Sequence, residues 1–272
     1  MDLVSLQNQL KDLPIGPIRF FDTIGSTNEE ALQWADHGAP DLSIVFADEQ
    51  TNGRGRQGRK WFTPAGSAIA CSILLKDIAS NKLSESVPAQ SFLLPRLTAL
   101  GTIAVCDALR NQYQLEPRIK WPNDVLLQDK KVAGVLTEIQ WQGEVCSSVV
   151  IGIGVNVYPG SIPPQDEIIS PATCVQDKLR IKISRLDLIK SILGKFLQYY
   201  PQLFEPTFSA YWNDYLAYKG EWVNLYIPNA SQINQRMNVK IIGVTAEGNL
   251  KVLTSSGTEK SLINGEISFK QK

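Results

Sequence analysis

The alternation of apolar and polar residues divides the chain into a long region of strands and helices and a shorter region of strands only. Short runs rich in β-branched and aromatic residues predict strands, and apolar residues repeating every three to four positions predict helices. Strands are predicted at 18–21, 43–47, 67–75, 118–127, 131–139 and 147–157. Helices are predicted at 26–35, from Pro95 to about Asn111, and at 184–200 and 207–218, after a short lead over residues 1–15.

The pattern changes after Lys219 and Gly220, where short alternating segments replace the helices. Strands are predicted there at 221–227, 238–245, 250–253 and 258–269, with glycine-containing turns at 247–249 and 255–257. About 50 residues with such short strands and tight turns are typical of a small β-barrel. We therefore predict a boundary near residue 219, with a larger domain over 1–218 and a small barrel domain over 219–272.

Two of the predicted strands contain residues that strands rarely hold. Pro122 lies inside 118–127, and because proline cannot donate to a ladder, a bulge or a sheet edge is predicted at 121–124. Gly152 and Gly154 interrupt the apolar strand 147–157, where they relieve packing or let a ligand or another backbone come close.

The start of the helix at 26–35 also has two interpretations. Ser26 or Thr27 is followed by Glu29 and Glu30, which is typical of a helix cap with acids in the first turn. The free N–H groups of a helix start are equally suited to holding a polar group of a ligand.

Charge and apolar content exclude several classes of protein. The 272 residues carry 27 basic and 27 acidic side chains, so a general attraction to nucleic acid or membrane is not expected. No apolar run approaches the roughly 20 residues that span a bilayer. Asp2 stands where a signal peptide needs cations. A cytoplasmic protein without a membrane segment is predicted.

Cysteine and histidine offer no obvious catalyst or metal site. The four cysteines form no C-x-x-C pair and have no histidine nearby, so most are predicted to be buried free thiols; they are Cys71, Cys106, Cys146 and Cys174. The single histidine, His37, precedes Gly38 and Pro40, a pattern that ends a helix. A Ser-His-Asp or Cys-His catalyst is therefore not predicted.

The segment 48–61 concentrates positive charge on a glycine-rich backbone. Four cations and three glycines fall within 53–60, which suits a loop that folds around an anion. The glycine spacing matches a dinucleotide fingerprint, but residues 59–66 show no helical period, so a Rossmann site is not predicted. A Walker A site is excluded as well, because no Ser or Thr follows Lys60. A solvated basic loop, or one that binds RNA, remains the plain alternative.

Other polar residues complete an inventory rich in donors and poor in nucleophiles. It comprises Lys120, Lys131, Gln50, Asn123 and Asn156. Such a set suits the stabilisation of phosphate charge by position and electrostatics. A neighbouring carboxylate, that of Asp124, is the candidate ligand for a Mg²⁺ ion shared with phosphates.

Five motifs, taken in order, closely resemble those of biotin protein ligases. They are Ser26-Thr27-Asn28, Gln50 with 53–61, Lys120-Trp121-Pro122-Asn123-Asp124, Lys131-Val132-Ala133-Gly134 and Gly152-Ile153-Gly154-Val155-Asn156. The similarity covers roughly 18–160 and extends more weakly to 264–268. It implies an α+β fold in which helices flank a mixed or antiparallel central sheet, as in class II synthetases and biotin-lipoate ligases, with a small SH3-like barrel at the C-terminus.

The resemblance also implies a reaction in two steps. Biotin and ATP, with Mg²⁺, give biotinyl-5′-AMP and pyrophosphate, and a lysine of a biotin carboxyl carrier protein, such as that of acetyl-CoA carboxylase, then takes the biotinyl group. No tightly bound cofactor is implied. The missing nucleophile is thereby explained, because the attacking groups belong to biotin and to the acceptor.

Roles carry over from the family to matching positions. The biotin-binding residues implied are Ser26, Thr27, Asn28, Gln50, Gly53, Arg54, Gly55, Arg56, Lys131, Gly134 and Gly154. The ATP-binding residues implied are Arg54, Arg56, Arg59, Trp61, Asn123, Lys131 and Asn156. The catalytic candidates are Lys131 first, then Arg56, Asp124 and Lys120, with Asp124 as the candidate metal ligand. The loop 53–56 is expected to cover the adenylate and exclude water.

Several alternatives stay open at this level. Only about 17 residues precede the first strand, so the helix-turn-helix module of some family members does not fit and DNA binding is not expected. A lipoate-protein ligase-like enzyme and a non-catalytic biotin or adenylate sensor are the rival functions. An exposed sheet edge can pair or stay single, so both a monomer and a homodimer are compatible with the sequence.

Overall fold

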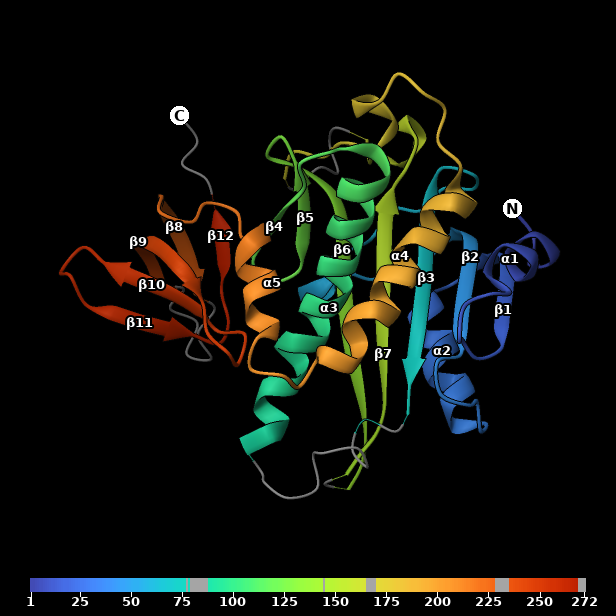
Figure 1. Ribbon diagram of the computed structural model, residues 1–272, viewed down its shortest axis with the longest axis horizontal. Coiled ribbons are helices and arrows are strands. Elements are labelled where there is room, and N and C mark those ends of the chain that lie inside the picture. Colours follow the sequence, from blue (N-terminus) through green and yellow to red (C-terminus); the bar gives the residue numbers. More distant parts are fainter. Residues whose placement is uncertain (77, 79–87, 144, 165–169, 228–234, 269–272) are drawn as a thin grey trace.

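Two sheets of unequal size form the framework of the protein (Figure 1). The computed structural model describes residues 1–76, 78, 88–143, 145–164, 170–227 and 235–268. A seven-stranded sheet lies at the centre with helices on its two faces, and a five-stranded sheet lies beside it, next to α5 (Phe208–Tyr215). The predicted α+β fold class is confirmed.

The larger sheet is mixed, with strand order β1-β2-β3-β7-β6-β5-β4. Its strands are β1 (Ile18–Ile24), β2 (Ile44–Gln50), β3 (Ala68–Leu75), β4 (Arg118–Lys120), β5 (Asp124–Leu127), β6 (Lys130–Gln142) and β7 (Val145–Asn156). Only β1 and β2 run parallel, joined by the crossover helix α2 (Thr27–Asp36), and the other neighbours are antiparallel. The order brings β2, β6 and β7, on which three of the five motifs begin or lie, to the middle of the larger sheet.

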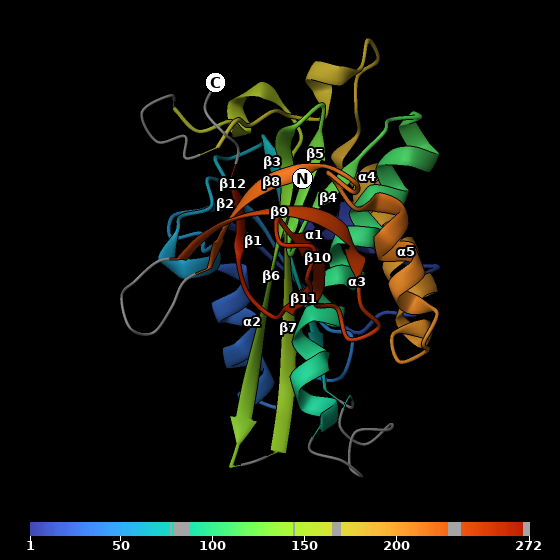
Figure 2. The ribbon, with the colours of Figure 1, turned by 90° about the vertical axis from the view of Figure 1, so that its left-hand side faces the viewer.

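The period-two alternation of the strands assigns each helix to a face. Val45, Leu74 and Val150 pack with Ala31 and Ala35 of α2. Their neighbours along the strands belong to the larger core, which includes α3 (Pro88–Tyr113) and α4 (Arg185–Tyr199). Figure 2 shows α2 on one side of the sheet and α3, α4 and α5 on the other. The short helix α1 (Leu3–Leu10) contacts α4 and β1. The motif-bearing start of α2 therefore approaches the face of the sheet opposite to α3 and α4.

Helix α3 does not begin after Pro95, as predicted, but at Pro88. A proline removes one hydrogen bond and strains the preceding turn, yet its fixed φ is compatible with a helix, so it is not a certain start signal. Pro95 lies where the helix passes the turn at 246–248, since a Cβ added at Gly248 would lie 2.7 Å from Pro95 Cβ. The proline therefore packs against the C-terminal part of the chain.

Of the two alternatives predicted at 121–124, the sheet edge is confirmed and the bulge is wrong, because Pro122 follows the edge strand β4 and lies in the turn after it. Strands β4 and β5 are separate and pair antiparallel, with Lys120 opposite Asp124 and a cis Trp121–Pro122 peptide in the turn. A register irregularity does occur nearby, between Val125 and Leu126, where β5 pairs with β6. A proline has no N–H for the ladder, so a turn suits it better than a strand interior. The tight turn places Asn123 and Asp124 at the end of the sheet.

The smaller sheet has the order β11-β10-β9-β8-β12. Its strands are β8 (Trp222–Ile227), β9 (Gln235–Val244), β10 (Leu250–Thr254), β11 (Glu259–Leu262) and β12 (Glu266–Ser268). The single strand predicted at 258–269 is thus two strands, because the chain turns at 263–265 and β12 returns to pair with β8. Among the described residues β11 and β12 are the two edges, so the predicted barrel is open and compatible with an SH3-like fold.

Several smaller predictions are confirmed and one helix is shorter than expected. His37 is the C-terminal cap of α2, and Ser184 caps α4 by accepting from the backbone N–H of Asp187 at 3.2 Å. All four cysteines are free and buried. The helix predicted at 207–218 ends at Tyr215, because Ala217 donates its N–H to the carbonyl of Ile119 at 2.9 Å. No helix in the described ranges is long and apolar enough to cross a membrane.

Candidate active site

The motif segments border one cavity, which is lined by residues of the larger sheet and of the loop 48–61. Every residue predicted for the site lines this cavity except Gly53, which lines a second pocket next to the loop 48–61. The predicted residues that line it are Ser26, Thr27, Asn28, Gln50, Arg54, Gly55, Arg56, Arg59, Trp61, Lys120, Asn123, Asp124, Lys131, Gly134, Gly154 and Asn156. Segments that are far apart in the sequence are therefore brought to one place.

At one end of the cavity, amide and hydroxyl groups surround the first residues of α2. Ser26 is the N-terminal cap, but its side chain makes no capping hydrogen bond, so capping by the Ser26 hydroxyl is wrong. Gln50, at the end of β2, supplies the acceptor instead: its Oε1 accepts from the Thr27 N–H at 2.9 Å and from Thr27 Oγ1 at 3.1 Å. Gln50 Nε2 donates to Thr63 Oγ1 at 3.1 Å, which fixes the orientation of the amide.

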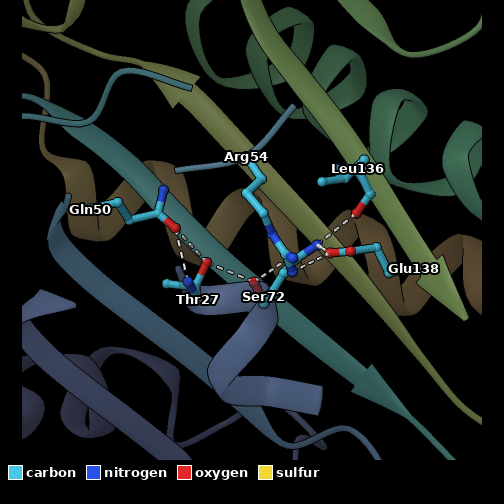
Figure 3. A network of polar contacts seen from close by, with 7 residues as sticks. Thr27, Gln50, Arg54, Ser72, Leu136 and Glu138 are labelled. Carbon is cyan, nitrogen blue, oxygen red and sulfur yellow. Dashed lines mark hydrogen bonds and ion pairs between the residues drawn. The ribbon is translucent and has the colours of Figure 1, made fainter. Parts of the chain in front are cut away.

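Asn28 is hydrogen-bonded to residues of two strands, β3 and β6, and Figure 3 shows these partners. Its Nδ2 donates to Glu138 Oε2 at 2.7 Å and to the Leu136 carbonyl at 3.2 Å, and its Oδ1 accepts from Ser72 Oγ at 2.6 Å. A Cβ at Gly152 would lie 2.1 Å from Asn28 Oδ1, so the glycine makes room for this amide. We call the region around Asn28, Thr27 and Gln50 the neutral end of the cavity.

The loop 48–61 forms a short hairpin-like structure instead of opening an α-helix. Gln50 bridges to Thr63 and Arg54 to Lys60, and a three-residue 3-10 turn, Arg56–Gly58, lies at the tip. Gly53 packs tightly, since a Cβ there would lie 2.3 Å from a backbone oxygen across the loop. The absence of a helix after the glycines agrees with the rejection of a dinucleotide fingerprint. Arg54 reaches back to Glu138, with 3.1 Å between Nη2 and Oε2.

Trp61 lies over the glycines that the sequence singled out. A Cβ at Gly154 would lie 2.3 Å from Trp61 Cε2, and one at Gly134 would lie 3.4 Å from Cζ3. The space next to Gly152 is thus occupied by the Asn28 side chain, and the space next to Gly154 by the Trp61 side chain. The Trp61 Nε1–H is buried and makes no hydrogen bond within the described residues. Lys131 Nζ lies 5.4 Å from the ring centroid, within cation–π range.

The other end of the cavity carries positive charge, and we call it the cationic end. Lys131 Nζ forms an ion pair with Asp124 Oδ1 at 2.6 Å. Arg56 Nη1 donates to Asn123 Oδ1 at 3.2 Å, and Lys120 is buried close by. Burial lowers the pKa of Arg56 and of Lys120, against the opposing effect of the Asp124 charge. Cations that are held in partial burial attract an anion more strongly than solvated cations do.

A carboxylate from the smaller sheet joins the cationic end. Glu266, on β12, forms an ion pair with Arg59, and this hydrogen bond raises the pKa of Arg59. Burial acts to raise the pKa of Glu266, but the Arg59 hydrogen bond and the nearby cations outweigh it, so the net shift is downward. Asn156, at the end of β7, donates from Nδ2 to the Thr173 carbonyl at 3.1 Å. The cavity therefore uses residues from both sheets.

The carboxylates of the cavity suit Mg²⁺ only if substrate phosphates also coordinate the ion. Within the described residues no three His, Cys, Asp or Glu side chains gather as metal ligands. Two carboxylates, Asp124 and Glu266, line the cavity at its cationic end. Because Mg²⁺ is commonly held by one or two carboxylates plus substrate phosphates, a nucleotide that brings its own oxygens would complete the coordination.

Sequence reasoning missed several residues that shape the site: Ser72, Thr63, Glu138 and Glu266. A lone charged residue in an alternating strand is typical of a solvated face, so Glu138 gave no signal of its own. The period-two rule could have found it, because Glu138 lies on the same face of β6 as the predicted site residue Gly134. Ser72 and Glu266 depend on which strands pair, and no local pattern reveals that.

Comparison with known proteins defines the class. The profile of the biotin/lipoate A/B protein ligase family matches residues 20–156, which include every predicted site residue, and the chain belongs to this family. This range contains the larger sheet apart from the first two residues of β1, and it contains most of the residues that line the cavity.

Several similar proteins are named as biotin ligases. The bifunctional ligase/repressor BirA of Bacillus spizizenii is 34% identical over 242 residues, which make up 88% of this chain and 70% of that protein. A biotin–[acetyl-CoA-carboxylase] ligase of Paracoccus denitrificans is 38% identical over 150 residues, 51% of this chain and 58% of that protein. The structure of the biotin protein ligase of Aquifex aeolicus in complex with biotin and ATP aligns with a TM-score of 0.74 at 27% identity, covering 93% of this chain and 97% of that one.

Proposed function

We propose that the protein is an ATP-dependent biotin protein ligase. It forms biotinyl-5′-AMP from biotin and ATP and transfers the biotinyl group to a lysine of a biotin carboxyl carrier protein, such as that of acetyl-CoA carboxylase. The observation that carries the proposal is a single cavity with a neutral, hydrogen-bonding end and a cationic end. Biotin and ATP together have this polarity, since the ureido head is uncharged and the carboxylate and phosphates are anions. The structural neighbour that binds both molecules supports the proposal.

The neutral end holds the biotin head in this proposal. Thr27, Asn28 and Gln50 present donors and acceptors whose orientations are fixed by other protein groups. A ureido group has two N–H donors and one carbonyl acceptor, and a fixed set of amides and hydroxyls can satisfy them without reorganisation. The rest of the proposed biotin-binding set comprises Ser26, Gly53, Arg54, Gly55, Arg56, Lys131, Gly134 and Gly154.

The cationic end promotes the first chemical step. A carboxylate oxygen of biotin attacks the α-phosphorus of ATP, the bond to the β-phosphate oxygen breaks, and pyrophosphate leaves. Lys131, placed against Trp61 and paired with Asp124, stabilises the charge of the carboxylate and the α-phosphate. Arg54, Arg56, Arg59, Trp61, Asn123 and Asn156 are the proposed ATP-binding residues, with Lys120 as an additional buried cation.

The second step transfers the acyl group. The neutral amine of an acceptor lysine attacks the carbonyl carbon of the mixed anhydride, the bond to the phosphate oxygen breaks, and AMP leaves while the amine loses a proton. Arg54 and Arg56 lie on the loop 48–61, which borders the cavity and separates the intermediate from water. When Mg²⁺ is bound with ATP, it neutralises phosphate charge, and Asp124 is the side chain proposed to hold it.

We also propose a division of the chain near residue 219 into a ligase domain, 1–218, and a small barrel domain, 219–272. Supporting this, all strands of the larger sheet lie before residue 157 and all strands of the smaller sheet lie after 221. Glu266 contributes to the cavity, so the smaller domain completes the proposed ATP end. A cytoplasmic location and the absence of DNA binding stay predictions from the sequence.

The test is to mix the protein with ATP, Mg²⁺, biotin and a biotin carrier domain, and to look for biotin on the carrier by mass spectrometry. We expect a mass increase on one lysine that depends on ATP. Preferential attachment of lipoate in competition would favour the rival ligase. A folded protein that binds biotin and ATP but labels no carrier would be a sensor and would contradict the proposal.

A further inference from the structure

We propose that Glu138 is a positioning residue of the ligase, through which the neutral end of the cavity holds Arg54 of the loop 48–61. The inference rests on the proposed function, because it assigns the neutral end to the biotin head. It adds a link between two parts of the site that the sequence motifs treat separately.

A single oxygen atom makes the link. Glu138 Oε2 accepts from Asn28 Nδ2 at 2.7 Å and is paired with Arg54 Nη2 at 3.1 Å. Figure 3 shows the carboxylate of Glu138 pointing toward the end of the Arg54 side chain, with Thr27 on the opposite side of the arginine. An amide of the proposed biotin-head site and a guanidinium of the loop thus share one acceptor.

The position of Glu138 on its strand explains how one residue reaches both groups. Gly134, Leu136 and Glu138 are alternate residues of β6, so they lie on the face of the sheet that α2 covers. The Leu136 carbonyl accepts from the same Asn28 amide. Leu136 and Glu138 also line the second pocket, next to the loop 48–61. The side chains of Arg54 and Glu138 are 37% and 28% exposed. The pair is therefore partly shielded from solvent, where hydrogen bonds to charged groups are stronger than at the surface.

Sharing an acceptor couples the two groups thermodynamically. A ligand that orders Asn28 also fixes the Glu138 carboxylate, and this lowers the conformational entropy that Arg54 loses on docking. By linkage, docking of Arg54 raises the affinity of the neutral end for its ligand by the same factor. Binding of the biotin head therefore favours the contact between Arg54 and Glu138. Glu138 transmits the effect without touching the reacting atoms.

The decisive variant is Glu138→Gln, which keeps the size and one acceptor oxygen but removes the charge that holds Arg54. We expect biotin to bind about tenfold more weakly, as measured by calorimetry, and biotinyl-5′-AMP to escape faster from the enzyme. The affinity for ATP alone is expected to change less than the affinity for biotin. Glu138→Asp, which retains the charge but is too short to reach both donors, is expected to shift biotin affinity in the same direction and serves if the glutamine variant folds poorly.

A matched control lies on the same helix as Asn28. Glu30 pairs with Arg19 at 2.7 Å, with side-chain exposures of 19% and 42%, but it lies outside the cavity. Glu30→Gln removes a comparable ion pair, and we expect biotin affinity and adenylate retention to stay at the parent values. Loss of biotin affinity in both variants alike would show a general structural effect and would overturn the inference.

A double-mutant cycle between Glu138→Gln and Arg54→Gln measures the coupling itself. We expect the double variant to bind biotin about as weakly as Arg54→Gln alone, because the second substitution removes an interaction that is already broken. Additive losses, or parent-like affinity in Glu138→Gln, would contradict the role of Glu138. If the parent protein binds no biotin at all, the proposed function fails instead, so the two failures are distinguishable.

Discussion

The two ends of the cavity differ in how their polar groups are satisfied. At the neutral end, Thr27, Asn28 and Gln50 are hydrogen-bonded to other protein groups. At the cationic end, the described lining residues include four cations, Lys120, Lys131, Arg56 and Arg59, and two carboxylates, Asp124 and Glu266. The neutral end is thus preorganised without net charge, whereas the cationic end carries an excess of positive charge.

Because of this difference, one part of the cavity can bind an uncharged ligand head while the other part stabilises negative charge during the reaction. Fixed neutral dipoles favour an uncharged ligand head and distinguish it by hydrogen-bond geometry, because a misplaced donor or acceptor leaves a buried group unsatisfied. Excess positive charge in partial burial favours anions, and favours them most where negative charge gathers during the reaction. Substitutions at the neutral end should therefore change binding of the uncharged head, and substitutions at the cationic end should change binding of anionic groups and the rate of adenylation.

The largest effect is expected for Lys131→Ala, which removes the proposed charge stabiliser. We expect the rate of biotin-dependent pyrophosphate exchange to fall by about 100- to 1000-fold, as for the loss of a transition-state donor in other enzymes. The neighbouring Lys130→Ala is the control, because Lys130 is exposed and lies outside the cavity. Equal exchange rates for Lys131→Ala and the parent protein, in variants that fold normally, would contradict the assignment.

Gly154→Ala tests whether the close packing of Trp61 on Gly154 is needed for ATP binding. The added Cβ would lie 2.3 Å from Trp61 Cε2, so the indole must move. Overpacking of this kind costs about 1–3 kcal/mol, and we expect a rise of about tenfold or more in the KM for ATP. Gly194→Ala on α4 is the control, since a Cβ there meets nothing within 4 Å. An unchanged Trp61 fluorescence and an unchanged KM would argue against the proposed contact of Trp61 with the nucleotide.

Arg56→Gly tests the loop as a cover for the intermediate. Arg56 reaches Asn123 across the cavity at 3.2 Å, and glycine removes both this contact and the charge. We expect biotinyl-5′-AMP to leave the enzyme about tenfold faster, because one charge-assisted hydrogen bond is lost. Retention is measured by rapid gel filtration of the enzyme after adenylation. Retention equal to that of the parent protein would exclude a covering role for this arginine.

The smallest effect is expected for Glu266→Gln and concerns stability as a function of pH. The net effect of burial, the Arg59 bond and nearby cations lowers the pKa of Glu266 below its ordinary value of 4.5. A carboxyl group whose pKa is lowered in the folded state stabilises that state above pH 4.5, and the stabilisation is lost as the pH falls through the lowered value.

We therefore expect Glu266→Gln to be less stable than the parent at pH 7 by about 0.5–1 kcal/mol, as for partly exposed ion pairs. The gap between the two melting temperatures should close on acidification below pH 4.5. A gap that stays constant down to pH 3 would show that the Glu266 charge contributes nothing.

The sequence allowed the fold class and the members of the site to be predicted, because both depend on local patterns. Alternation along the strands indicated the sheet, and the ordered motifs indicated which residues gather around the cavity. The ends of elements were less predictable. Pro95 and Pro122 were given the wrong local roles, since a proline fits a helix interior or a turn according to what packs around it.

Contacts within the site were the least predictable part. Nothing local to Ser26 indicates that Gln50 accepts the hydrogen bond at the start of α2, and nothing local to Gly154 indicates that Trp61 fills its space. Such contacts depend on the strand order, which brings β2, β3, β6 and β7 side by side. Glu138 and Glu266 become visible as parts of the site only after these pairings are known.

In the proposed site, the neutral end binds the biotin head and the cationic end binds the biotin carboxylate. The most direct test compares the affinity of biotin with that of biotin methyl ester, which keeps the head but has no charge, in the parent, Gln50→Ala and Lys131→Ala. We predict that Gln50→Ala weakens both ligands by the same factor, whereas Lys131→Ala weakens biotin and leaves the ester unchanged. Equal weakening of both ligands by Lys131→Ala would contradict the claim.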